Sequence, residues 1–92
     1  MELSEIRPQI DAVNREMLRL FEKRMALCAQ VAACKKAQGM EIFVPEREAA
    51  ILDGVREMAA EGMERYDLAF FEKLMELSRE YQRELLGLPE NQ

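Results

Sequence analysis

The chain has 92 residues, enough for one small domain, and its 13 Lys and Arg residues against 18 Asp and Glu residues give a net charge of −5. This acidic balance argues against a nucleic-acid partner, and the absence of histidine excludes an imidazole base or a His-ligated metal. Two cysteines, Cys28 and Cys34, are too few for a disulfide framework and suit the reducing cytoplasm. No apolar run is long enough to mark export or a membrane span, so we expect a cytoplasmic protein without a membrane partner.

The first predicted helix covers residues 4–38. Ser4 is a candidate N-cap, Pro8 is tolerated in a first turn, and Gly39 supplies the C-terminal stop. Residues spaced three and four apart form a coiled-coil-like seam along this helix. The seam consists of Ile6, Ile10, Val13, Met17, Leu20, Arg24, Leu27, Val31 and Lys35.

Two shorter helices are predicted over residues 45–61 and 67–86. Pro45 suits the first position of the second helix, and Gly62 follows its end. Asp67 is a candidate N-cap for the third helix, which Gly87 terminates. Residues 87–92 are expected to form a tail or the start of a linker.

The helix lengths predict a dimer. The first helix would be about 52 Å long, whereas the other two would be about 26 and about 30 Å. Two helices of half its length cannot cover the whole seam, so the overhanging apolar half needs another chain. We therefore expect an all-α fold of three helices that forms an intertwined homodimer with antiparallel long helices.

Polar side chains interrupt the apolar stripes of all three predicted helices. Arg24 and Lys35 are 11 residues apart, a net rotation of about 20° and a rise of about 16 Å, so both can point into one cavity. The other interruptions are Arg47 and Glu48 in the second helix and Ser78 and Gln82 in the third. Buried cations need an anion, and two interpretations are open: an internal salt-bridge network through Glu48, or a site for a small anion.

Arg7 lies 17 residues before Arg24, about 25 Å along the same helix, so it cannot reach the same cavity within one chain. In an antiparallel dimer it could enter the partner's site, and the alternative is a solvated arginine. The charged residues from Arg79 to Glu84 are expected to form a solvated helix face.

The ordered set of these residues resembles the all-α (AroQ class) chorismate mutases of bacteria over nearly the whole chain. The resemblance is carried by Ile6-Arg7, Lys23-Arg24, Lys35, Arg47-Glu48 and Ser78-x-x-x-Gln82. It implies an isomerase that rearranges chorismate to prephenate in phenylalanine and tyrosine biosynthesis, working as an interlocked dimer with two active sites. The reaction is a unimolecular pericyclic shift that needs no base, nucleophile, metal or cofactor, only a dianion held in one compact conformer.

The resemblance also implies the parts of the site that bind the substrate carboxylates. Residues matching Arg24, Arg47 and the partner chain's Arg7 help to hold the two carboxylates, and the residue matching Ser78 lies at the ring carboxylate. The residue matching Lys35 contacts a carboxylate as well as the ether oxygen.

The remaining implied roles concern the ring and the breaking bond. Lys35 and Gln82 would meet the negative charge that grows on the ether oxygen as the C–O bond breaks, like the donors of an oxyanion hole. Glu48 would bind the ring hydroxyl, and Val31 and Met75 would line the apolar walls. One departure is Val44, which stands where the family often has an Asp three residues before the Arg-Glu pair, so the start of that helix lacks this carboxylate.

Two other functions compete with the mutase. An isochorismate–pyruvate lyase has the same fold, and the segment Val44-Pro45-Glu46-Arg47 has some likeness to such lyases, whereas Glu48 favours the mutase. A non-catalytic dimerisation or regulatory bundle would need the apolar seams but not several polar side chains directed inward.

Overall fold

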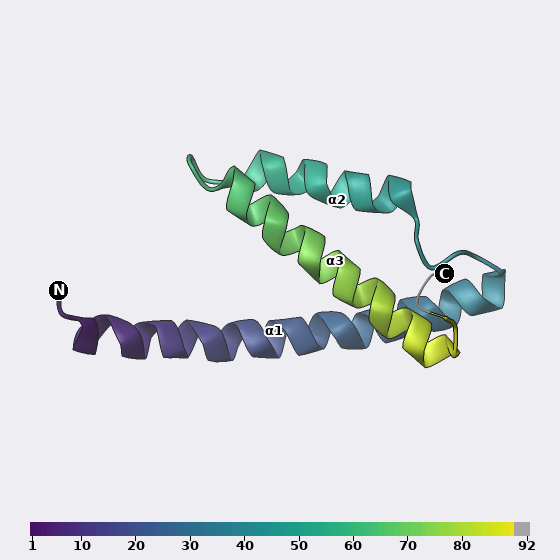
Figure 1. Cartoon of the computed structure of the whole chain (residues 1–92), viewed down its shortest axis with the longest axis horizontal. Coiled ribbons are helices and arrows are strands. Elements are labelled where there is room, and N and C mark those ends of the chain that lie inside the picture. Colours follow the sequence, from purple (N-terminus) through teal and green to yellow (C-terminus); the bar gives the residue numbers. More distant parts are fainter. Residues whose placement is uncertain (90–92) are drawn as a thin grey trace.

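The computed structural model describes residues 1–89 and consists of three helices, α1 (Leu3–Gln38), α2 (Pro45–Met58) and α3 (Glu64–Leu86) (Figure 1). Residues 1–89 contain no strand, which confirms the predicted all-α class with one long and two shorter helices. Of the predicted tail, residues 87–89 follow α3 without helical structure, and residues 90–92 lie outside the described residues.

The start of α1 differs from the prediction. Its N-cap is Glu2 rather than Ser4, and Glu2 makes no side-chain capping hydrogen bond. The helix therefore begins early enough that Pro8 lies inside it, in the second turn, where its missing N–H leaves one helical hydrogen bond unmade. Pro8 is exposed, so water can satisfy the carbonyl that loses its partner.

The end of α1 is as predicted and leads the chain back over the helix. Gly39 adopts a left-handed conformation with φ 68°, the Gly39 N–H donates to the Lys36 carbonyl, and the Met40 N–H donates to the Lys35 carbonyl at 2.8 Å. This pair of hydrogen bonds is the Schellman motif, which favours glycine because a Cβ strains the left-handed conformation. Residues 39–44 thus form a short connection whose first turn is tied to Lys35.

The boundary between α2 and α3 also differs from the prediction. α2 begins at Pro45 as expected but ends at Met58 instead of residue 61, because Ala59 is extended. α3 begins at Glu64, and its N-cap is Met63 rather than Asp67. Asp67 instead lies in the first turn, where its carboxylate also interacts favourably with the helix dipole, so composition alone does not distinguish the two positions.

α3 is the only helix that contacts both of the others among the described residues, and α1 and α2 do not touch each other there (Figure 1). The buried apolar side chains are few and come from every part of this arrangement. They are Ala32, Ile42, Val55 and Met75. Two polar residues of α3, Ser78 and Gln82, are buried with them, so the packing of α3 includes a polar region.

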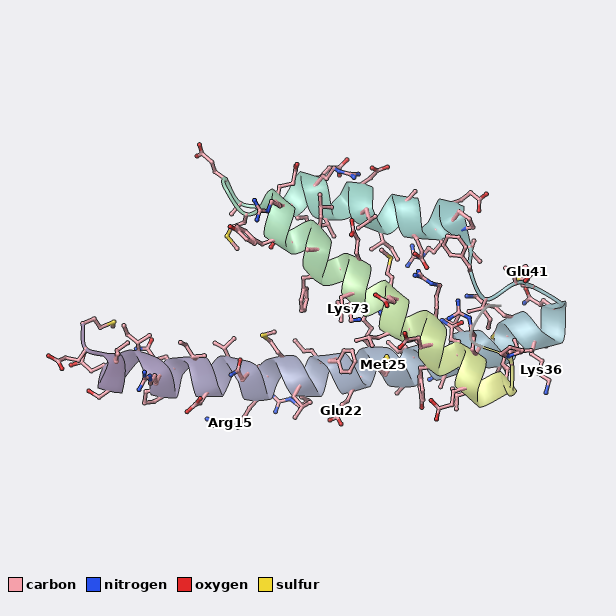
Figure 2. The ribbon with its side chains drawn as sticks, viewed as in Figure 1. Arg15, Glu22, Met25, Lys36, Glu41 and Lys73 are labelled. Carbon is pink, nitrogen blue, oxygen red and sulfur yellow. The ribbon has the colours of Figure 1, made fainter. Side chains whose placement is uncertain are left out.

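The N-terminal half of α1 extends away from α2 and α3, and the molecule measures 54 × 25 × 19 Å (Figure 1). Seam residues Ile10, Val13, Met17 and Leu20 are between 45% and 59% exposed. Arg15 and Glu22 project from the edge of α1 that faces away from α2 and α3 (Figure 2). The helix is therefore amphipathic along a length that one copy of the chain leaves uncovered.

We predict opposite effects for two Gly→Ala substitutions. Gly39→Ala should lower the free energy of unfolding by about 1 kcal/mol, because it places a Cβ in the left-handed conformation. Gly54→Ala should raise it by about 0.5–1 kcal/mol, because Gly54 is inside α2 and nothing lies within 4 Å of the position that its Cβ would take. Urea unfolding at one fixed protein concentration measures both, and a Gly39→Ala protein as stable as the wild type would contradict the role of this cap.

Candidate active site

One cavity of about 310 Å³ lies where the second half of α1, the connection 39–44, the start of α2 and the second half of α3 meet. Every residue predicted for the site lines it except Arg7. These residues are Arg24, Val31, Lys35, Arg47, Glu48, Met75, Ser78 and Gln82. The cavity is large enough for a small organic ligand, whose pockets begin at about 300 Å³.

The spacing of residues along α1 explains its contribution to the cavity. Arg24, Cys28, Val31 and Lys35 follow one another by four, three and four residues, and all four line the cavity. Arg24 and Lys35 therefore share one cavity, as their separation predicts. Cys28 lies between them and was not predicted as a site residue.

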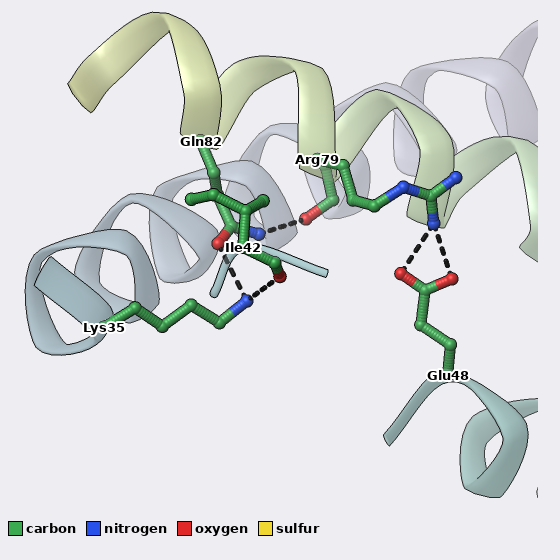
Figure 3. Close-up of polar contacts among 6 residues, drawn as sticks. Lys35, Ile42, Glu48, Arg79 and Gln82 are labelled. Atoms are coloured by element: carbon green, nitrogen blue, oxygen red, sulfur yellow. Dashed lines mark hydrogen bonds and ion pairs between the residues drawn. The ribbon is translucent and has the colours of Figure 1, made fainter. Parts of the chain in front are cut away.

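A chain of hydrogen bonds connects the two sides of the cavity, and Figure 3 shows its part around Lys35, Ile42 and Gln82. The Lys35 ammonium donates to the Ile42 carbonyl oxygen at 2.5 Å and to the Gln82 Oε1 at 3.1 Å. The Gln82 Nε2 donates to the Ser78 Oγ at 3.0 Å, and the Ser78 hydroxyl donates to the Cys28 Sγ at 3.0 Å. The orientation of the Gln82 amide follows from Lys35, because an ammonium can only donate and must face the amide oxygen.

Burial affects the ionisation of Lys35. Desolvation lowers the pKa of Lys35 below its ordinary value of 10.5, and the opposing attraction of Cys28 and Glu48 does not offset it. The ammonium is thus held partly out of water, with two neutral oxygen acceptors and no contacting carboxylate in the described part of the chain.

Glu48 is paired with a residue that the sequence analysis assigned to a solvated face. Arg79 Nη1 lies 2.5 Å and 2.6 Å from the two carboxylate oxygens of Glu48, and both side chains are largely buried. The expectation of solvation is therefore wrong for Arg79, which lines the cavity. The available signal was its spacing, because Met75, Ser78, Arg79 and Gln82 follow one another by three, one and three residues on one helix face.

The Arg79–Glu48 pair distinguishes the two interpretations of the cavity cations, which were an internal salt-bridge network and a site for a small anion. Among the described residues, Glu48 is the only carboxylate that lines the cavity, and Arg79 occupies it. In residues 1–89, no carboxylate oxygen lies within 4.0 Å of the side-chain nitrogens of Arg24, Lys35 or Arg47. The internal salt-bridge network is therefore not formed there, and the cavity has an excess of positive charge that suits an anion.

The other walls of the cavity are apolar, and one predicted residue lies elsewhere. Met75 is buried, Val31 is half-exposed, and Ile42 and Ile51 extend the same surface. Arg7 is exposed near the N-terminus of α1 and does not line this cavity. Residues 1–89 contain no group of three or more Cys, Asp and Glu side chains that could hold a metal ion. No helix among them is both long and apolar enough to cross a membrane.

Comparison with known proteins gives the family of this chain. The chain is 43% and 45% identical to T-proteins from Haemophilus influenzae and Enterobacter agglomerans, over 59% and 63% of its length. It spans only 14% and 16% of the length of these T-proteins. It is also 33% identical to a chorismate mutase from Methanocaldococcus jannaschii, over 97% of this chain and 92% of that protein. The model of the chorismate mutase type II family matches residues 6–83, and the chain therefore belongs to this family.

Proposed function

We propose that this chain is an isomerase that rearranges chorismate to prephenate. The observation that supports this most directly is a cavity lined by Arg24, Lys35 and Arg47. None of these three cations has a carboxylate partner in the described part of the chain. Chorismate is a dianion, so its two carboxylates supply the negative charge that the cavity lacks. Membership of the chorismate mutase type II family selects this dianion among the small anions that the charge alone would accept.

The proposed mechanism begins with conformational restraint. The rearrangement is unimolecular, so the protein gains rate by holding the flexible dianion with its reacting carbons in contact. Arg24 on α1 and Arg47 on α2 approach the cavity from different helices and can therefore fix the two carboxylates at separate points. Val31 and Met75 give the ring an apolar surface on which to pack.

Lys35 and Gln82 are the proposed donors to the ether oxygen, where negative charge develops as the C–O bond breaks. An ammonium has three N–H donors, and two of those of Lys35 are used by Ile42 and Gln82. The amide nitrogen of Gln82 has two donors, and one is used by Ser78. Each group therefore keeps one donor for the substrate, while its other hydrogen bonds hold it in place before the substrate arrives.

The Ser78 hydroxyl can donate a hydrogen bond to the ring carboxylate, and the Glu48 carboxylate can accept one from the ring hydroxyl. A thiol is a weak acceptor, so the Ser78 hydroxyl proton that now faces Cys28 can turn to a ring carboxylate at little cost. The Glu48 carboxylate has about four acceptor positions, and one guanidinium nitrogen leaves some of them for the ring hydroxyl.

A second copy of the chain completes the proposed enzyme. The exposed seam of α1 continues into an apolar groove of about 540 Å³ between α1 and α3, lined among others by Met17, Leu20, Phe71 and Leu74. A long helix from another copy, running antiparallel, would cover this groove and bring its Arg7 to the cavity. We place this dimer in the cytoplasm, which the unpaired Cys28 and Cys34 favour.

The central test is the conversion of chorismate, followed by absorbance with identification of the product. We expect prephenate from the wild type, and Gln82→Ala should reduce kcat/KM by an amount equivalent to about 2–4 kcal/mol, the scale for removing one oxyanion-type donor. Circular dichroism controls for folding. If the wild type ignores chorismate and cleaves isochorismate with release of pyruvate, the chain is a lyase and the proposed mutase function is wrong.

The lowered pKa of Lys35 predicts an alkaline limit to activity. The protonated ammonium is the active form, so kcat/KM should fall as the pH rises through a pKa that lies below 10.5. Lys35→Arg should retain some activity without this fall, because a guanidinium stays charged throughout the range. The measurement is kcat/KM from about pH 7 to pH 10 for both proteins. A fall that persists in Lys35→Arg would mean that Lys35 is not the group whose deprotonation limits the activity.

Mixing two inactive variants tests the cross-chain role of Arg7. Arg7→Ala and Arg24→Ala homodimers should both be nearly inactive, whereas each heterodimer has one intact site and one site with both defects. An equal mixture that has fully exchanged subunits should recover about a quarter of wild-type activity, since half of its dimers are heterodimers. Mass spectrometry verifies the heterodimers, and a mixture that contains them without recovering activity would rule out the shared site.

A further inference from the structure

We propose that Arg79 is a positioning residue that holds the Glu48 carboxylate in place and neutralises it, so that the other cations of the cavity stay free for the dianion. The inference rests on the proposed function and extends it to a residue for which the family resemblance implies no role.

The geometry fixes both partners of this ion pair (Figure 3). One nitrogen, Arg79 Nη1, bridges the two Glu48 oxygens at 2.5 and 2.6 Å, and the side chains are 24% and 21% exposed. The Arg79 guanidinium carbon also lies 5.1 Å from the centre of the Phe43 ring, within the range of a cation–π contact. Arg79 is thus held from both α2 and the connection 39–44, and it holds Glu48 in turn.

The charges around the cavity explain why this position matters. Without Arg79, the Glu48 carboxylate would lose its ion-pair partner while lying in one cavity with three cations that have no carboxylate partner in the described residues. Lys35 already experiences the attraction of Glu48, which acts to raise its pKa. The freed carboxylate would therefore turn toward Lys35 or Arg47 and occupy a cation that the substrate needs. The loss of Arg79 would act on the substrate through Glu48 rather than by direct contact.

A double-mutant cycle on kcat/KM for chorismate separates an effect of Arg79 through Glu48 from a direct effect of Arg79 on the substrate. Arg79→Met, which keeps an unbranched apolar stem, is made in the wild type and in Glu48→Gln, where no charge remains to be neutralised. We expect Arg79→Met to lower kcat/KM about tenfold in the wild type and less than about twofold in Glu48→Gln, a coupling in the usual range for contacting charged residues. Arg79→Lys should restore part of the activity, because an ammonium can still pair with Glu48.

The matched control is the exposed pair on α2 in which Arg56 Nη1 lies 2.7 Å from an Asp53 oxygen. The same cycle with Arg56→Met and Asp53→Asn should show no coupling in kcat/KM, since neither residue lines the cavity. Circular dichroism and thermal unfolding verify each variant. If Arg79→Met does not fold, Arg79→Gln takes its place in the cycle.

Each outcome of the cycle has a defined meaning. Equal losses in both backgrounds would mean that Arg79 acts on the substrate or on the fold directly, which overturns the inference. An active enzyme with no loss in either background overturns it as well. If the wild type does not convert chorismate, the proposed function fails first, and the positioning role fails with it. Only a loss that depends on the carboxylate of Glu48 supports the proposal.

Discussion

The cavity depends on one buried amide. Gln82 is 4% exposed and lies on α3, the one helix of residues 1–89 that contacts both of the others. A buried amide without hydrogen-bond partners would lower the free energy of unfolding by about 1–3 kcal/mol. The fold meets this constraint by placing the Lys35 ammonium at the amide oxygen and the Ser78 hydroxyl at the amide nitrogen. The contact with Lys35 crosses from α1 to α3, so satisfying the amide favours the alignment of these helices in which the cations of α1 reach the cavity.

The distribution of charge is as important as its total. The chain carries −5 overall, yet residues 1–36 carry +2, from 7 basic and 5 acidic residues, and residues 37–92 carry −7, from 6 basic and 13 acidic residues. The fold concentrates positive charge further at the cavity. Glu48 is the only carboxylate that the described residues bring there, and it is paired with Arg79. An acidic exterior around a cationic cavity disfavours polyanions, which need a broad basic surface, but leaves room for a small anion.

Much of the architecture and of the site could be predicted from the sequence, for identifiable reasons. Helical periodicity determines which residues share a face, so the shared cavity of Arg24 and Lys35 followed from their separation alone. The ends of α2 and α3 could not be located to the residue, because Asp67 suits both an N-cap and a first turn. Arg79 was missed because it stands in a run of alternating charges. Only the folded chain shows that the Arg79 guanidinium on α3 contacts the Glu48 carboxylate on α2. The placement of Arg7 depends on a second copy and lies beyond the geometry of one chain.

The turn at Gly39 links the backbone of the cavity wall to the position of the Lys35 ammonium. The Lys35 carbonyl accepts from the Met40 N–H, and the Lys35 ammonium donates to the Ile42 carbonyl, so backbone and side chain of one residue tie down the same short connection. Lifting the connection would strip the ammonium of an acceptor and would also move Phe43 away from Arg79. The position of the connection and the orientation of both charged groups therefore depend on one another, and a displacement of residues 39–44 would disturb the Lys35 and Arg79 contacts together.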